Sequence, residues 1–167
     1  MKTVEITRNQ SVNLTKEGIT RISISTGFRK KVVNCQIDLY AIAFNAMDKG
    51  TILKKEKLLQ EHKEKKKVTV ELRELSQESQ ESQEVQRIIF IDEIYAVDSV
   101  SKAEPPYFIA TSEEKTWQFN VSHEIGWHRV IVGFELYRSN NDWYLRVVGN
   151  SVRHRLFRLM KAEYYDN

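Results

Sequence analysis

The sequence predicts an all-β protein, a two-sheet β-sandwich of about 8 to 10 short strands with a short helix at the C-terminus. Apolar and polar residues alternate with period two through most of the chain, which is typical of strands with one buried face. Turn-forming residues separate these alternating runs at short intervals. Hydrophobic residues make up 41% of the 167 residues and are enough for one continuous core, so a wholly disordered chain is excluded. We expect a single domain over residues 1–167.

The first half of the chain contains one dense apolar run and several looser ones. The run Cys35–Phe44 is the densest and indicates an interior strand. The charged segment Leu53–Lys66 fits two structures, a surface helix with favourably spaced charges or a strand followed by a solvated loop. Strands are expected around Val4 and Ile6, around Val12 and Leu14, around Ile22 and Ile24 before Gly27, over Cys35–Phe44, and around Val68, Val70 and Leu72.

Charges of opposite sign dominate residues 54–84. The segment Lys54–Lys67 contains seven lysines and three glutamates, and the segment Glu71–Glu84 contains five glutamates and one arginine. The triplet Ser-Gln-Glu occurs three times from 76 to 84 and offers no apolar residue to bury. We therefore expect a charged, low-complexity loop region over residues 54–84.

The second half of the chain gives the clearest hairpin and the only strong helix pattern. Four turn formers, Ser139–Asp142, separate two of its apolar runs. A helix is expected over residues 152–163, where Val152, Leu156, Leu159 and Met160 share one face and should face the core. Strands are expected over Ile88–Val97, Tyr107–Ala110, Trp117–Val121, Arg129–Arg138 and Trp143–Val148.

No segment carries a recognisable catalytic motif. His123, Glu124 and His128 resemble a zinc-protease motif, but that motif needs histidines four residues apart, and here they are five apart. Asp92 and Glu93 are adjacent in a strand, so their side chains point to opposite faces and cannot converge on one cation. We expect both at solvated edge positions. The sequence therefore predicts a protein with no catalytic residues and no small-molecule substrate.

The C-terminal end is the positive pole of the chain. The segment 146–161 contains five cationic residues and no carboxylate. On the expected helix Arg153, Arg155, Arg158 and Lys161 lie mostly away from the apolar face, and they are the candidate partner-binding residues. Three interpretations stay open: a docked helix with a solvated cationic face, a site for an acidic protein partner, and a site for an anionic membrane surface or nucleic acid.

One hairpin carries a family resemblance. The segment Val132–Gly149, VGFELYRSNNDWYLRVVG, resembles the closing hairpin of the TerD family of tellurite-resistance and bacterial stress proteins. In that family a Gly-Glu-Leu-Tyr-Arg-like strand and a polar turn lead into Trp-x-x-Arg-x-x-Gly. The segments Asn13–Lys16 and Ile37–Phe44 also follow the family's order, and weaker similarity covers residues 10–150. The matching hairpin positions are Glu135, Leu136, Tyr137, Arg138, Trp143, Arg146 and Gly149.

The resemblance implies a two-sheet β-sandwich without enzymatic activity that binds calcium through acidic loops and works in multiprotein complexes near the membrane. This sequence departs from the family at the calcium site. Asp38 matches the family's Asp-Leu-Asp motif, but Tyr40 replaces its second carboxylate and the lysine-rich Leu53–Lys67 replaces a later acidic loop. A phenol is a poor calcium ligand and lysines repel the ion. We therefore expect a degenerate calcium site with Asp38 as a residual ligand.

These observations together predict a divergent TerD-like scaffold or interaction protein of a stress or tellurite-resistance system, with no required cofactor. Its expected partners are other proteins of that system, some of them membrane-associated, and not nucleic acid. The alternative is a basic binding module for anionic surfaces, membrane headgroups or nucleic acid, through the lysine-rich segment and the C-terminal helix. No apolar run is long enough for a membrane span and the N-terminus lacks a secretory-signal pattern, so a cytoplasmic location is expected.

Overall fold

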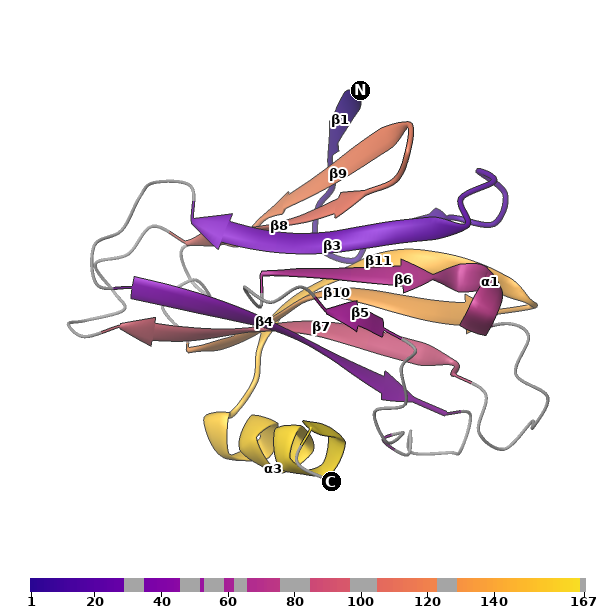
Figure 1. Cartoon of the computed structure of the whole chain (residues 1–167). Helices are drawn as coiled ribbons and strands as arrows, with labels where there is room; N and C mark the ends of the chain where they lie inside the picture. Colours follow the sequence, from indigo (N-terminus) through magenta and orange to yellow (C-terminus); the bar gives the residue numbers. More distant parts are fainter. Residues whose placement is uncertain are drawn as a thin grey trace.

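The computed structural model is a β-sandwich with a C-terminal helix packed on the outer face of one sheet, which confirms the expected fold class (Figure 1). It describes residues 1–28, 35–45, 52, 59–61, 66–75, 85–96, 105–122 and 129–165. The strands are β1 (Lys2–Glu5), β2 (Ser11–Asn13), β3 (Arg21–Phe28), β4 (Cys35–Phe44), β5 (Leu59–Glu61), β6 (Lys67–Glu71), β7 (Arg87–Ala96), β8 (Pro106–Thr111), β9 (Lys115–Asn120), β10 (Val130–Ser139) and β11 (Asp142–Ser151). The helices are α1 (Leu72–Leu75) and α3 (His154–Tyr165).

The strands form two sheets. The first sheet has the order β1-β9-β8-β3-β6-β5, and the second has the order β2-β11-β10-β7-β4. All neighbours pair antiparallel except β1 and β9, which pair parallel. The strand β5, which pairs with β6 inside the charged region, was expected only as one of two alternatives for Leu53–Lys66.

The charged region 54–84 is more ordered than a loop where the structure describes it. It contains β5, β6 and α1, and the alternation of Val68 and Val70 correctly predicts β6, where both side chains are fully buried. For the segment Leu53–Lys66, the strand at Leu59–Glu61 favours the strand alternative over the helix. Residues 54–58, 62–65 and 76–84 lie outside the described residues.

The hairpin between β10 and β11 is tighter than its four turn formers indicate. Ser139 lies directly opposite Asp142, so only Asn140 and Asn141 form the loop, with φ angles of 50° and 64°. Asparagine tolerates this left-handed conformation better than most residues, and a two-residue loop of this kind matches the twist of the paired strands. Local turn chemistry therefore fixes the register of the hairpin.

The core between the sheets is built on aromatic residues. Phe108 of the first sheet packs against Phe134 of the second with ring centroids 5.9 Å apart, and Phe119 lies 6.5 Å from each of them. Phe108 and Phe134 have no exposed surface. The inward positions of β3, Ile22 and Ile24, are also fully buried, as the period-two pattern predicts.

The second sheet is covered on both faces, because α3 packs on the face that points away from the first sheet (Figure 1). Every described side chain of β4 from Ile37 to Phe44 is buried for this reason. The helix docks through Phe157 and Tyr164, which are 0% and 2% exposed. Phe157 makes an edge contact with Tyr40 at 5.4 Å between ring centroids.

The helix is confirmed, and two of the four residues expected to face the core, Val152 and Met160, are partly buried against it. The expectation is wrong for the other two. Leu156 and Leu159, expected to face the core, are 51% and 63% exposed. The buried positions instead follow the spacing of Phe157, Lys161 and Tyr164, because the sheet presents Tyr40 and large rings bury more surface against it than leucines. The helix therefore turns its leucines and arginines toward solvent.

Neither described helix is long and apolar enough to cross a membrane.

Candidate partner-binding surface

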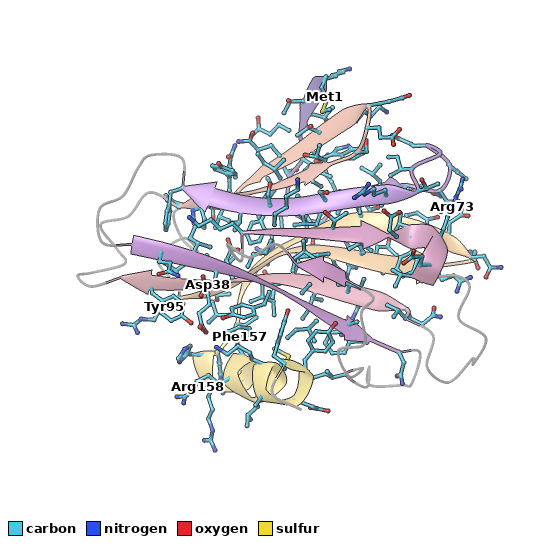
Figure 2. The ribbon with its side chains drawn as sticks, in the orientation of Figure 1. Met1, Asp38, Arg73, Tyr95, Phe157 and Arg158 are labelled. Carbon is cyan, nitrogen blue, oxygen red and sulfur yellow. The ribbon has the colours of Figure 1, made fainter. Side chains whose placement is uncertain are left out.

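The outer face of α3 combines cationic and apolar side chains in solvent. Arg153, Arg155 and Arg158 are all exposed, and Leu156 and Leu159 lie between and beside them in the sequence. Figure 2 shows Phe157 at the boundary between the helix and the sheet, while Arg158 points away from both. We call these five exposed residues, four on α3 and Arg153 directly before it, the α3 outer face.

Exposed apolar side chains are concentrated on this side of the molecule. Among the described residues the large hydrophobic side chains left exposed are Met1, Tyr95, Leu156 and Leu159. Tyr95 belongs to β7, and its side chain lies on the same face of that strand as Glu93, two residues away. Because Glu93 contacts α3, three of the four exposed apolar residues lie on the helix-bearing face. Clustering of this kind is typical of interaction surfaces.

Lys161, the fourth residue predicted to bind a partner, makes an internal contact instead. Its Nζ lies 3.3 Å from Glu93 Oε1, and only 27% of its side chain is exposed. His154 Nε2 lies 3.8 Å from the other oxygen, Glu93 Oε2. The structure therefore separates the three arginines, which are free to meet a partner, from Lys161, which faces the sheet.

The expectation that Asp92 and Glu93 sit at solvated edges is wrong. Their side chains do point to opposite faces, but β7 lies between β10 and β4 and both residues are buried, at 0% and 2% exposure. Asp92 faces the core between the sheets and Glu93 faces α3. One oxygen of each carboxyl group has a polar partner, Thr26 for Asp92 and Lys161 for Glu93. The other oxygens, Asp92 Oδ1 and Glu93 Oε2, are buried without a hydrogen-bond partner among the described residues.

Asp92 is held by a hydrogen-bond chain that joins the two sheets. The Thr26 hydroxyl of β3 lies within hydrogen-bond distance of Asp92 Oδ2 and also 3.0 Å from the carbonyl oxygen of Tyr107. A hydroxyl has one proton, so it can donate to only one of them. If Asp92 is protonated it donates to Thr26, which then donates to Tyr107. Burial raises the pKa of Asp92 well above its ordinary value, against the opposing effect of the Thr26 bond, and so favours this arrangement.

The described residues around Asp38 do not fit a calcium ion. Asp38 lies directly opposite Glu93 on the neighbouring strand and accepts a hydrogen bond from Gln36 at 3.1 Å. Glu93 is already paired with Lys161, and the Tyr40 ring packs against α3. Calcium takes six to eight oxygen ligands. Within the described part of the chain no group of three or more metal-ligating side chains converges, here or elsewhere.

The motif residues of the closing hairpin form an ionic cluster on the second sheet. Glu135 lies directly opposite Arg146, and its side chain, only 5% exposed, pairs with Arg146 and lies 3.8 Å from Arg87. The Arg146 guanidinium also lies 5.2 Å from the ring of Tyr137, which stacks on Tyr144. The glutamate of the first motif and the arginine of Trp-x-x-Arg are therefore joined by one cross-strand salt bridge.

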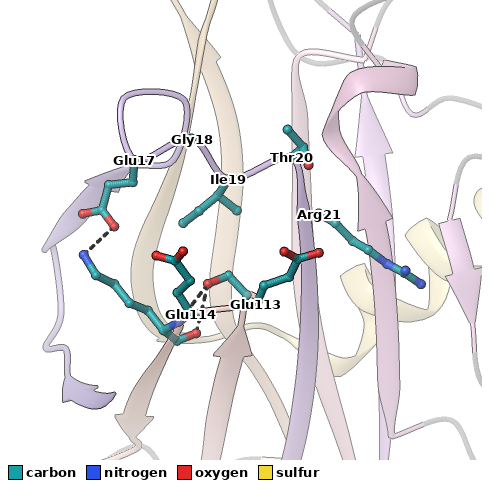
Figure 3. A pocket seen from close by; sticks show the side chains of 9 residues that line it. Glu17, Gly18, Ile19, Thr20, Arg21, Glu113 and Glu114 are labelled. Carbon is teal, nitrogen blue, oxygen red and sulfur yellow. Dashed lines mark hydrogen bonds and ion pairs between the residues drawn. The ribbon is translucent and has the colours of Figure 1, made fainter. Parts of the chain in front are cut away.

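A pocket of about 290 Å³ lies between the β2–β3 loop and the β8–β9 turn (Figure 3). Three of its five charged side chains, Glu17, Arg21 and Lys115, are paired within the chain. Lys115 Nζ lies 2.8 Å from Glu17 Oε2, and Arg21 lies 2.9 Å from Glu71. We assign no ligand to this pocket.

Sequence reasoning missed the groups that hold α3 in place. The Tyr165 hydroxyl donates to the carbonyl oxygen of Ala41 at 2.8 Å and accepts from its N–H at 2.9 Å. The spacing of Phe157, Lys161, Tyr164 and Tyr165 follows one helix face and was the available signal. Glu93 gave no such signal, because its partners are about 60 to 70 residues away in the sequence. His123, Glu124 and His128 lie outside the described residues.

Comparisons with known proteins agree with this architecture. One structural neighbour is a homologue of the telluride resistance protein TerD from Streptomyces coelicolor A3(2), with a TM-score of 0.56, 13% identity, and coverage of 84% of this chain and 95% of that one. Another is SAV2460, a protein of unknown function, with a TM-score of 0.54, 11% identity, and coverage of 81% and 93%. At these identities the likeness shows the fold. A comparison with functionally curated proteins gives no match. A sequence model of the TerD domain matches residues 2–163, nearly the whole chain, and the chain therefore belongs to the TerD family.

Proposed function

We propose that this TerD-family protein is a non-enzymatic scaffold of a tellurite-resistance or stress-response system, and that it binds an acidic protein partner through the α3 outer face. The observation that carries the proposal is the orientation of the docked helix. It exposes Arg155, Leu156, Arg158 and Leu159 together, although Phe157 between them is fully buried.

The chemistry of the α3 outer face favours an acidic partner with some apolar surface. Guanidinium groups bind carboxylates in a bidentate geometry, and arginine is enriched at the energetic centres of protein interfaces. Leu156 and Leu159 supply apolar contact area beside these charges. A scaffold of this kind needs no reaction centre of its own.

The proposal includes independence from calcium and a cytoplasmic location. Asp38 is the one matched ligand of the family motif, and its carboxylate neighbour Glu93 already has Lys161 as its counter-ion. Calcium binding is therefore not required to neutralise this part of the fold. Other proteins of the same system, some of them at the membrane, are the proposed partners.

Replacing Arg153, Arg155 and Arg158 together by glutamine should abolish capture of the partner in a pull-down from extracts of the source cells. Binding by the natural protein should also fall steeply between low and moderate salt, because exposed charges are screened over about 10 Å at 0.1 M ionic strength. The readout is the amount of bound partner at each salt concentration, with identification of the captured chain.

The matched control removes the same charge elsewhere on the surface. Lys2, Lys16 and Arg73 are exposed and belong to other elements, so their replacement by glutamine should leave capture unchanged. Equal loss in both triple variants would show a general charge effect, and full capture by the arginine variant would remove the α3 outer face from the proposal.

A second candidate function is binding to an anionic membrane surface, favoured by the exposure of Leu156 and Leu159 next to arginines. Helices of this type lie in the headgroup region with their apolar residues inserted. Vesicles with and without anionic lipid, and oligonucleotides, tested across a salt series, separate the candidates. Binding to anionic vesicles that is lost on replacing both leucines by serine supports the membrane. Absence of binding to vesicles and oligonucleotides at low salt would exclude this second candidate and leave the acidic protein partner as the proposed ligand.

A further inference from the structure

Part of the outer face of the second sheet lies beyond α3. The helix packs on Tyr40 in the middle of β4, and Phe44, four residues further on, has its side chain on the same face of the strand. Four residues of a strand span about 13 Å, and this end of β4 extends past the helix in Figure 1. Arg87 of β7 lies directly opposite Phe44, and its guanidinium carbon is 4.3 Å from the centre of the Phe44 ring. Arg87 therefore belongs to the same face of the sheet as α3.

Two arginines share one carboxylate on this part of the face. Arg87 Nε lies 3.8 Å from Glu135 Oε1, and Arg146 Nη2 contacts the other oxygen, Glu135 Oε2. Among the described residues Glu135 is the one carboxylate paired with either arginine. We call Arg87, Glu135 and Arg146 the arginine cluster. It contains two cationic groups for one carboxylate, so one positive charge is left without an anion of its own.

The arginine cluster is held in place and is also half exposed. The Arg146 guanidinium carbon lies 5.2 Å from the centre of the Tyr137 ring, and Tyr137 stacks on Tyr144 with ring centroids 5.1 Å apart. The side chains of Arg87 and Arg146 are 42% and 46% exposed, against 5% for Glu135. A guanidinium carries five N–H donors in a fixed fork, so each arginine keeps donors beyond the one nitrogen that contacts Glu135. Because rings and carboxylate already orient both groups, a further oxyanion would bind with little loss of side-chain entropy.

We infer that the arginine cluster binds a carboxylate of the acidic partner, so that an acidic segment of that partner crosses the outer face of the second sheet from α3 to β11. The inference rests on the proposed function and adds a second contact to it. A partner carboxylate balances the second arginine, and forked guanidinium groups bind carboxylates in a bidentate geometry. Arginine and tyrosine are also the residue types enriched at the energetic centres of protein interfaces.

The test measures binding of a fluorescein-labelled peptide of twelve glutamates by fluorescence anisotropy at low salt. In extended form the peptide reaches about 40 Å, more than a helix diameter of about 10 Å plus the roughly 13 Å between Tyr40 and Phe44. The triple variant Arg87→Gln/Glu135→Gln/Arg146→Gln should bind it roughly tenfold more weakly than the natural protein, because hydrogen bonds to a charged group are lost. Replacing the glutamate together with the arginines leaves no buried carboxylate without a counter-ion, so the variant should fold.

Two further variants separate a specific site from general attraction to a basic surface. The triple variant removes two positive charges and one negative charge, and Lys2→Gln, at an exposed position of β1, lowers the net charge by the same single unit. Lys2→Gln should leave the affinity for the peptide unchanged. Arg87→Lys/Arg146→Lys keeps every charge and the pairing with Glu135 but removes the planar forks, and it should bind roughly threefold more weakly.

The outcomes separate this inference from the proposed function. Unchanged affinity in the triple variant, an equal loss in Lys2→Gln, or full binding by the lysine variant would each overturn the inference. The glutamine variant of Arg153, Arg155 and Arg158 is measured with the same peptide. Weaker binding by that variant alone would support the α3 outer face and remove the arginine cluster. Weaker binding by the triple variant alone would support the arginine cluster and contradict the proposed role of the α3 outer face.

Discussion

Replacing Gly133 by alanine should lower the free energy of unfolding by about 2 to 3 kcal/mol. A Cβ atom at Gly133 would lie 2.4 Å from two ring carbons of Phe108, far inside normal contact. Phe108 comes from the opposite sheet and is fixed between Phe119 and Phe134, so its ring has nowhere to move. Denaturant unfolding of the natural protein and Gly133→Ala measures the difference.

Gly27→Ala is the matched control, since its added Cβ meets only the end of the Tyr107 side chain, which is half-buried and can shift. We expect a smaller loss there. Combining Gly133→Ala with Phe108→Leu should cost less than the sum of the two single changes, because the smaller side chain makes room for the methyl group. Strictly additive losses would show that the close contact between the sheets does not determine the effect.

Asp92→Asn should make the protein more stable than its natural form by a margin that grows with pH. An unfolded aspartate has a pKa of about 3.9, whereas burial raises the pKa of folded Asp92. Between these two pKa values the folded state holds one proton more than the unfolded state. The contribution of Asp92 to stability therefore falls as pH rises through this window, with a slope of at most about 1.4 kcal/mol per pH unit.

Asparagine donates to Thr26 as a protonated aspartate would, and it does not titrate. Unfolding free energies of both proteins at several values between about pH 4.5 and 8 give the margin directly. Glu114→Gln removes an exposed carboxylate in the β8–β9 turn and should give a margin that hardly changes with pH. A margin for Asp92→Asn that is constant across this range would show that Asp92 is ionised in the folded protein.

The strands were predictable because their signal is local. Ile22 and Ile24 alternate with polar residues and are buried, and the asparagines at 140 and 141 mark the hairpin turn. A period of two residues shows only which side of a strand is apolar. That information was sufficient to predict which strand faces are buried between the two sheets. The dense apolar run Cys35–Phe44 predicted an interior strand. This is right for the burial of β4 on both faces but wrong for its position, because β4 is the edge strand of the second sheet in the described part of the chain.

The buried charges and the docking face of α3 were not predictable in this way. Whether Glu93 is solvated depends on Lys161, which is 68 residues away and reaches it only after the helix folds back on the sheet. The leucines of α3 look like a core face in isolation, but the aromatic surface around Tyr40 selects Phe157 instead. Long-range partners decide both features. For α3 the local spacing of its aromatic residues competes with that of its leucines, and for Glu93 no local pattern indicates burial.

Thermal unfolding of the natural protein in millimolar calcium and in chelator, with Asp38→Asn alongside, tests the central claim that this TerD-family fold works without the ion. A ligand present at 100 times its dissociation constant stabilises by about 2.7 kcal/mol, which raises the unfolding temperature by roughly 5 to 10 °C for a chain of this size. We expect no such shift in either protein. A shift in the natural protein that disappears in Asp38→Asn would show a working calcium site and contradict the claim.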